Sequence, residues 1–134
     1  HDGSVELLRS YLMQILVHTY RIIDPFFSNR AISQIMDFLK AHYADPISLD
    51  SLSQLVGYTP QYVSKLFNRE VGTNFLDFLQ HYRMEQACVL LSHTDMSTAE
   101  VAAAVGYQDA RHFSKLFRRY QKISPHAYRK AFMQ

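Results

Sequence analysis

Two regions of the chain repeat the same pattern of residues. The first contains Leu55-Val56-Gly57-Tyr58, which recurs as Ala104-Val105-Gly106-Tyr107, and Ser64-Lys65-Leu66-Phe67, which recurs unchanged as Ser114-Lys115-Leu116-Phe117. The offset is 49 residues from Gly57 to Gly106 and 50 residues from Ser64 to Ser114. A helical segment, a glycine turn and a second helical segment form the sequence pattern of a helix-turn-helix, in which the second helix is presented to a DNA major groove. The repeat therefore predicts two such units.

Capping residues divide the chain into helices, and strand patterns are nearly absent. Helix starts are indicated by residues whose side-chain oxygens accept from free backbone amides, namely Ser48, Thr59, Ser97, Asp109 and Ser124. Helix ends are indicated by Gly57, Gly72 and Gly106, because a left-handed residue after a helix is cheapest as glycine. We expect helices at about 5–23, 30–43, 48–56, 60–72, 73–92, 97–105 and 110–121, and a short one after Ser124-Pro125. The predicted fold class is all-α.

Each predicted unit has its own apolar set. The first set is Leu52, Val56, Val63, Leu66 and Phe67, and the second is Val101, Val105, Phe113, Leu116 and Phe117. The helix expected between the units, at about 73–92, is roughly 27–30 Å long at 1.5 Å per residue. Successive major grooves on one face of B-DNA recur at about 34 Å. A rod of this length predicts two recognition helices in adjacent grooves of one duplex.

Composition narrows the function classes. The chain has 134 residues, a size that buries a core without disulfides or metals. Its one cysteine, Cys88, excludes an internal disulfide and a multi-cysteine zinc site, and it is expected as a small core residue. No apolar run reaches the roughly 18 residues of a membrane span. A lone thiol and the lack of a secretory segment favour the cytoplasm.

Charge is distributed unevenly along the chain. Residues 97–134 carry seven Lys and Arg against two Asp and Glu, or +5, whereas residues 1–46 and 47–96 carry −1 and −2. A basic end of this kind favours a polyanionic partner. Helical hairpins with glycine turns also occur in bundles, so the pattern alone leaves open a helical protein-interaction module that binds no specific DNA.

Catalytic and metal-binding patterns are not found in the sequence. No Ser-His-Asp order, carboxylate pair or glycine-rich phosphate loop stands out, so we do not expect an enzyme. The seven histidines form neither an HExxH motif nor a pair spaced by four residues, so we expect neither a metal site nor a cofactor.

Several ordered motifs extend the repeat. They are Leu52-Ser53-x-x-Val56-Gly57-Tyr58, Tyr62-Val63-Ser64-Lys65-Leu66-Phe67, Gly72, Arg83-x-x-x-Ala87-x-x-Leu90-Leu91, Val101-Ala102-x-x-Val105-Gly106-Tyr107, Phe113-Ser114-Lys115-Leu116-Phe117 and Ser124-Pro125-x-x-Tyr128-Arg129. With these motifs in this order, the segment from about Ile47 to Phe132 closely resembles the DNA-binding domain of AraC/XylS-type bacterial transcription regulators. The resemblance implies a seven-helix double helix-turn-helix over residues 30–134, with units at about 48–70 and 97–121. It also implies binding to double-stranded promoter DNA, usually as an activator, with RNA polymerase as a further partner.

The resemblance places recognition helices at 60–70 and 110–121. Candidate base or backbone contacts are Gln61, Ser64 and Lys65 in the first helix, and Arg111, His112, Ser114 and Lys115 in the second. Candidate phosphate contacts are Lys65, Arg69, Arg118, Arg119 and Arg129. Arg and Lys can donate to guanine, and Gln can pair with adenine. The sequence departs from the family pattern at Lys122, where glycine is frequent, and at His112, where tyrosine is common.

The first 29 residues lie outside the main resemblance. Their apolar stripe consists of Val5, Leu8, Leu12, Ile15 and Ile22. We interpret it as the end of an upstream effector-sensing region that pairs two copies through residues 5–23; packing on the DNA-binding domain is the alternative. Residues 25–29 are expected to link the two parts. Because His1-Asp2-Gly3 lacks an initiator methionine, we expect the chain to be a fragment.

Overall fold

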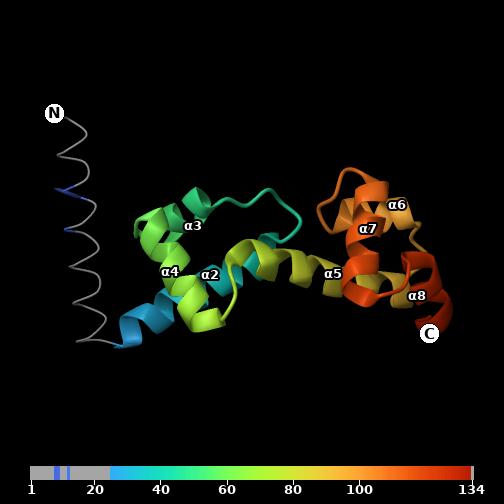
Figure 1. The fold of residues 1–134 in the computed structure, drawn as a ribbon, viewed down its shortest axis with the longest axis horizontal. Helices are drawn as coiled ribbons and strands as arrows, with labels where there is room; N and C mark the ends of the chain where they lie inside the picture. Colours follow the sequence, from blue (N-terminus) through green and yellow to red (C-terminus); the bar gives the residue numbers. More distant parts are fainter. Residues whose placement is uncertain (1–7, 10–11, 13–24, 134) are drawn as a thin grey trace. The chain divides into compact units, whose positions relative to one another are not determined.

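The computed structural model describes residues 8, 9, 12 and 25–133, and within them the chain is helical with no strand (Figure 1). Its helices are α2 (Pro25–His42), α3 (Leu49–Val56), α4 (Pro60–Val71), α5 (Phe75–His93), α6 (Thr98–Ala104), α7 (Ala110–Gln121) and α8 (Pro125–Phe132). The all-α prediction is confirmed. The helix predicted at 5–23 falls almost entirely outside the described residues.

The chain divides into two compact units. Of the described residues, the first comprises those up to Ala41 together with Ile47–Phe75, and the second comprises His42–Pro46 together with those from Leu76 onward. The first therefore contains nearly all of α2 with α3 and α4, and the second contains most of α5 with α6, α7 and α8.

In the first unit, local capping sets the helix-turn-helix as predicted. The Ser48 hydroxyl accepts from the Ser51 amide at 3.2 Å, and the Thr59 hydroxyl accepts from the Tyr62 amide at 3.2 Å. Gly57 ends α3 in the left-handed region at φ 78°. Between the two helices, the Ser53 hydroxyl donates to the carbonyl of Tyr58 and closes the turn. Helices α3 and α4 pack against each other.

The core of the first unit comes from its three helices. The fully buried side chains are Ile35, Leu39, Leu52, Val63, Leu66 and Phe67. Val56, which the sequence predicts in this core, is only half-buried. It occupies the last turn of α3, where the chain already turns away at Gly57.

The second unit repeats this construction around a larger aromatic core. The buried residues from α5 are Met84, Ala87 and Leu91, and those from α6, the turn and α7 are Val101, Ala102, Val105, Tyr107, Phe113, Leu116 and Phe117. The Phe113 and Phe117 rings lie 5.8 Å apart, and Phe117 meets the edge of Tyr128 from α8 at 5.5 Å. The five apolar residues predicted for this unit are all buried.

The N-terminal boundary of α2 differs from the boundary predicted from the sequence. We expect this helix from about residue 30, but α2 begins at Pro25, so the predicted start is wrong and residues 25–29 are helical. Proline disfavours helix in the residue before it and is well suited to the first helical position, so Pro25 can start a helix. Cys88, expected as a core residue, is half-buried. No helix of the described residues is long and apolar enough to cross a membrane.

Candidate nucleic-acid interface

Helix α7 has a buried apolar face and an exposed basic one. Phe113, Leu116 and Phe117 face the core. The predicted contact residues Arg111, His112, Lys115, Arg118 and Arg119 are exposed, and Ser114 is half-buried. The Asp109 carboxylate caps the helix by accepting from the Arg111 amide at 2.9 Å. Packing against α6 and α8 thus leaves the polar side of α7 directed to solvent.

Helix α4 has the same two faces with less charge. Tyr62, Val63, Leu66 and Phe67 are buried, whereas Gln61, Lys65 and Arg69 are exposed and Ser64 is half-buried. The Arg69 guanidinium lies 3.4 Å from the Glu70 carboxylate, which offsets its charge. Lys65 is therefore the one cation of α4 without a neighbouring carboxylate among the ion pairs of the described residues.

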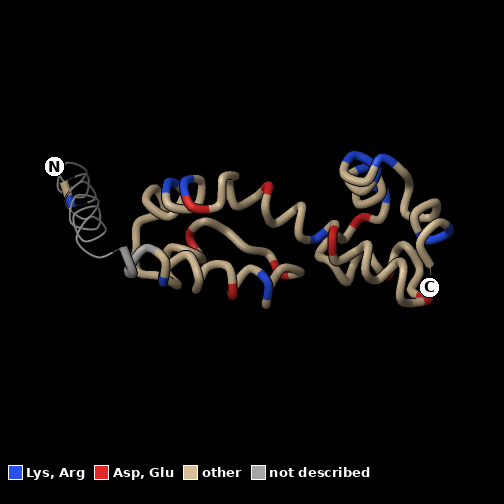
Figure 2. The backbone as a smooth tube through the Cα atoms, turned by 90° about the horizontal axis from the view of Figure 1, so that it is seen from below, with Lys and Arg blue, Asp and Glu red and all other residues tan. Residues whose placement is uncertain are grey.

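Positive charge in the second unit gathers on α7 (Figure 2). This helix contains Arg111, Lys115, Arg118 and Arg119 and no Asp or Glu. None of the four takes part in an ion pair among the described residues. Their charges are therefore available to an anionic partner.

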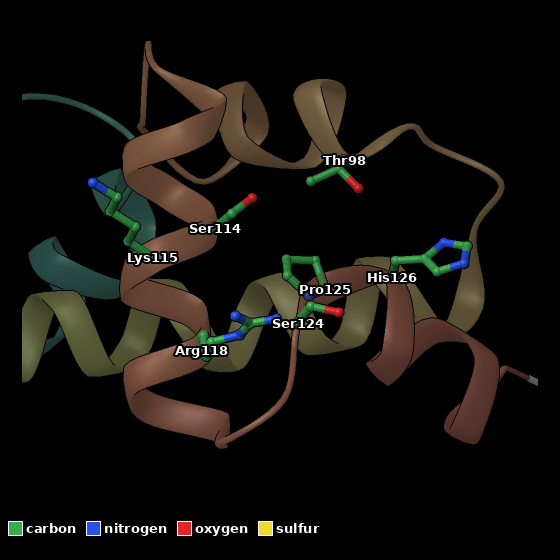
Figure 3. Close-up of a pocket in the computed structure, with 7 residues that line it drawn as sticks. All are labelled: Thr98, Ser114, Lys115, Arg118, Ser124, Pro125 and His126. Atoms are coloured by element: carbon green, nitrogen blue, oxygen red, sulfur yellow. The ribbon is translucent and has the colours of Figure 1, made fainter.

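An open hollow of about 330 Å³ lies beside α7. Its lining consists of Thr98 from α6, Ser114, Lys115 and Arg118 from α7, and Ser124, Pro125 and His126 from the start of α8. In Figure 3 the Ser114 hydroxyl points into the hollow from α7, Thr98 lies across from it, and the Lys115 side chain points away from both. Three predicted site residues are thus brought together. Sequence reasoning missed Thr98 and His126 as site residues, because the capping pattern indicated only that helices start near them.

Arg129 is placed differently from the other predicted contacts. Its Nε donates to the carbonyl oxygen of Leu91 at 3.0 Å, and one terminal nitrogen donates to the carbonyl of Thr94 at 3.2 Å. Both carbonyls lie at or just beyond the C-terminal turn of α5, where carbonyls lack helical partners. The geometry assigns Arg129 to joining α8 to the end of α5, and we leave it out of the proposed interface.

A second arginine positions the turn that precedes α7. The Arg83 Nε donates to the carbonyl of Tyr43 at 2.6 Å, and a terminal nitrogen donates to the carbonyl of Asp45 at 3.0 Å. The same guanidinium lies 5.4 Å from the centre of the Tyr107 ring. Burial raises the pKa of Tyr107, while the neighbouring Arg83 acts in the opposite direction. Arg83 thus holds residues 43–45 and the turn after α6 against α5.

Among the described residues, no group of three His, Cys, Asp or Glu side chains is arranged to hold a metal ion. His81 instead lies 3.2 Å from Glu85 one helical turn away and packs against the Tyr120 ring.

Comparison with known proteins identifies the family. A family model described as a helix-turn-helix domain matches residues 52–131. The crystal structure of an AraC-type DNA-binding transcriptional regulator from Chromobacterium violaceum shares 25% sequence identity, with a TM-score of 0.74 over 80% of this chain and 96% of that one. The chain belongs to the AraC/XylS-type family. It is a DNA-binding domain of a transcription regulator, and the predicted double helix-turn-helix fold is confirmed.

Two further relatives place this AraC-type domain in context. The AdpA DNA-binding domain, solved in complex with a target DNA, is 26% identical with a TM-score of 0.71, covering 75% of this chain and 90% of that one. An uncharacterised helix-turn-helix-type transcriptional regulator of Staphylococcus aureus is 28% identical over 96% of this chain. The chain spans only 18% of that relative's length.

Proposed function

We propose that this AraC-type domain binds a specific sequence of duplex DNA by inserting α4 and α7 into successive major grooves, and that it activates transcription through RNA polymerase. The observation that carries the proposal is α7, a helix with a buried aromatic face and four exposed cations without ion pairs among the described residues. The AdpA domain, a relative of the same fold, was solved with target DNA.

The length of α5 supports the use of two grooves. Its 19 residues correspond to about 28 Å at 1.5 Å per residue, which is comparable to the roughly 34 Å between major grooves on one face of a duplex. A single chain would then recognise an asymmetric site.

The contacts are proposed by side-chain chemistry. Arg111, His112 and Lys115 on α7, with Gln61 and Lys65 on α4, are exposed and are proposed to read base edges. Arg118 and Arg119, with Arg69 on α4, are proposed to contact phosphates, which set the register of the protein on the duplex without reading its sequence. Ser64 and Ser114 are half-buried and are proposed as short-range donors.

Charge predicts different contributions from the two units. Because Arg69 faces Glu70 whereas the α7 arginines have no such partner among the described residues, we propose that the second unit supplies more of the salt-sensitive affinity. The first unit then contributes less of the salt-sensitive affinity, through Lys65 and Arg69, and adds neutral contacts from Gln61 and Ser64.

Fluorescence anisotropy tests the proposal. Duplexes selected by the chain from a random pool are titrated at two salt concentrations, and the observed binding constant is expected to fall steeply with salt as counterions are released. A helical protein-interaction module would bind no duplex at either concentration. Selection of a defined consensus sequence would establish specificity.

Two matched lysines separate base reading from phosphate contact. Lys65 and Lys115 occupy equivalent positions of the repeat. Each change to alanine is expected to weaken binding to the selected duplex by roughly 1–3 kcal/mol and to a random duplex by less, if these residues read bases. Equal losses on both duplexes would make them phosphate contacts.

A further inference from the structure

The hollow beside α7 combines donors from three helices. Its lining includes the side chains of Arg118 and His126 and the hydroxyl-bearing residues Thr98, Ser114 and Ser124, and it contains no carboxylate; Lys115 borders it, but its side chain points away (Figure 3). Among the described residues, neither Arg118 nor Lys115 forms an ion pair. A site with cationic and hydroxyl donors and no acceptor charge suits an anion with several oxygens.

The repeat provides an internal comparison for this lining. In the earlier copy of the repeat, Asn68 corresponds to Arg118, Leu49 corresponds to Thr98, and Leu76 in α5 corresponds to His126. Ser114 and Lys115 keep their identities as Ser64 and Lys65. The helix-turn-helix framework therefore does not itself require the polar lining, which is particular to the second unit.

The place of the hollow favours a phosphate of DNA over a free anion. Ser114, Lys115 and Arg118 lie on the proposed recognition helix itself, so an occupant of the hollow sits at the side of that helix. When a helix enters a major groove, the phosphates that border the groove come close to its flanks. In Figure 3 the Ser114 hydroxyl faces the hollow, and Arg118 lies at its edge near Ser124.

We propose that this hollow receives one backbone phosphate of the bound duplex, held by the Arg118 guanidinium and by the hydroxyls of Ser114 and Thr98. This inference rests on the proposed function and adds Thr98 to the interface. The guanidinium fork supplies two parallel donors to a phosphate, the Ser114 hydroxyl supplies a single donor from the same helix, and the Thr98 hydroxyl supplies one from α6 across the hollow. The contact fixes the position of α7 along the groove.

Substitution of single phosphates by neutral methylphosphonates tests the proposal. Each phosphate of a duplex selected from a random pool is replaced in turn, and binding of the chain is measured by anisotropy. We expect at least one position at which neutralisation weakens wild-type binding roughly tenfold or more, as for the loss of a hydrogen bond to a charged group. Arg118→Asn introduces the residue found at the equivalent position of the first unit. In this variant, neutralising the same phosphate is expected to cause no additional loss of affinity.

A neighbouring arginine provides the matched control. Arg119→Asn makes the same change in charge on the same helix, but Arg119 does not line the hollow. This variant is expected to keep its full sensitivity at the phosphate that Arg118→Asn no longer senses. Thr98→Val, which removes one hydroxyl at nearly constant shape, is expected to reduce the sensitivity at the same position by a smaller factor. Thermal unfolding by circular dichroism checks that the variants fold.

The outcomes separate this inference from the proposed function. Suppose that wild type binds duplex DNA, but Arg118→Asn and Arg119→Asn respond equally to neutralisation of every phosphate. The hollow then holds no phosphate of the duplex, and the inference is overturned. If Arg118→Asn keeps full sensitivity at every phosphate of the duplex while inorganic phosphate raises the melting temperature of wild type but not of Arg118→Asn at matched ionic strength, the hollow binds a free anion and not a phosphate of DNA. Absence of binding to any duplex overturns the proposed function and the inference with it.

Discussion

The Nε of Arg83 donates a hydrogen bond of 2.6 Å to the backbone carbonyl of Tyr43, forty residues earlier in the chain. A second donor of the same guanidinium reaches the carbonyl of Asp45 at 3.0 Å. One side chain of α5 thus fixes the segment that precedes α3 onto the second unit. No local pattern indicates these partners, because they are distant in sequence.

Loss of Arg83 is expected to destabilise the chain. Arg83→Ala removes two charge-assisted hydrogen bonds from half-buried surroundings, and we expect the free energy of unfolding to fall by roughly 2–3 kcal/mol. Arg83→Lys keeps the charge without the planar fork and should recover only part of the loss. Urea unfolding of the three proteins measures both values; equal stability of wild type and Arg83→Ala would show that these bonds contribute nothing net.

The two turn glycines are expected to differ in their tolerance of a side chain. A Cβ at Gly106 would lie 2.8 Å from the Ala44 carbonyl oxygen and 3.1 Å from the Arg83 guanidinium carbon, at φ 103°. We expect Gly106→Ala to lower the free energy of unfolding by roughly 2–4 kcal/mol, since overpacking adds to backbone strain.

Gly57 is the control for this change. It occupies the equivalent turn at φ 78°, where an added Cβ would meet no atom within 4 Å beyond its immediate chain neighbours. Gly57→Ala should therefore lower the free energy of unfolding only by the cost of the left-handed backbone conformation, about 1 kcal/mol. Similar losses for both variants in urea unfolding would contradict the role assigned to the Ala44 contact.

Lys122 is the one non-glycine residue with positive φ among the described residues, at φ 69°, and it ends α7 where Gly72 ends α4. Lys122→Gly relieves a left-handed conformation and is expected to stabilise the chain by roughly 1 kcal/mol. Lys122→Ala removes the same charge but keeps the strain, so it should not stabilise. Melting temperatures of the two variants provide the comparison, and a stabilised alanine variant would point to charge instead of backbone strain.

Arg129 is expected to affect stability without affecting the salt dependence of DNA binding. Its donors to the Leu91 and Thr94 carbonyls are internal, so Arg129→Ala should lower the free energy of unfolding by roughly 1.5–3 kcal/mol. The log-log slope of binding against salt should stay at the wild-type value, since no phosphate contact is lost. A slope shallower by about one unit would instead return Arg129 to the interface.

High pH is expected to unfold the first unit through Tyr58. Burial is the main cause that raises the pKa of Tyr58 to about 12, with the neighbouring Tyr62 as a second cause. An unfolded chain releases the phenolic proton near pH 10, so the folding stability contributed by the neutral form is complete below pH 10 and falls as pH rises towards 12. Tyr58→Phe, which cannot ionise, should lose less stability over this interval in urea unfolding. An identical decline in both proteins would assign the effect to other groups.

Local chemistry explains why the sequence predicted the helices well. Ser48, Thr59 and Ser97 each cap a helix by accepting from an amide three residues onward, so both partners of the bond lie within one short segment. Pro25 shows where this reasoning failed. A proline can follow the end of one helix or start the next, and the sequence around it does not decide between the two.

The sequence alone determined the repeat, its caps, its apolar faces and the side chains that α4 and α7 expose, because each of these depends on neighbours within one or two helical turns. Only the tertiary structure decided the roles of Arg83 and Arg129, whose carbonyl partners lie 35 to 40 residues away. It also decided that Thr98 and His126 lie beside Ser114 and Arg118 in one hollow. The physical reason is the same in each case. Capping sets where each helix begins and ends along the chain, but only packing around the aromatic core brings the ends of different helices together in space.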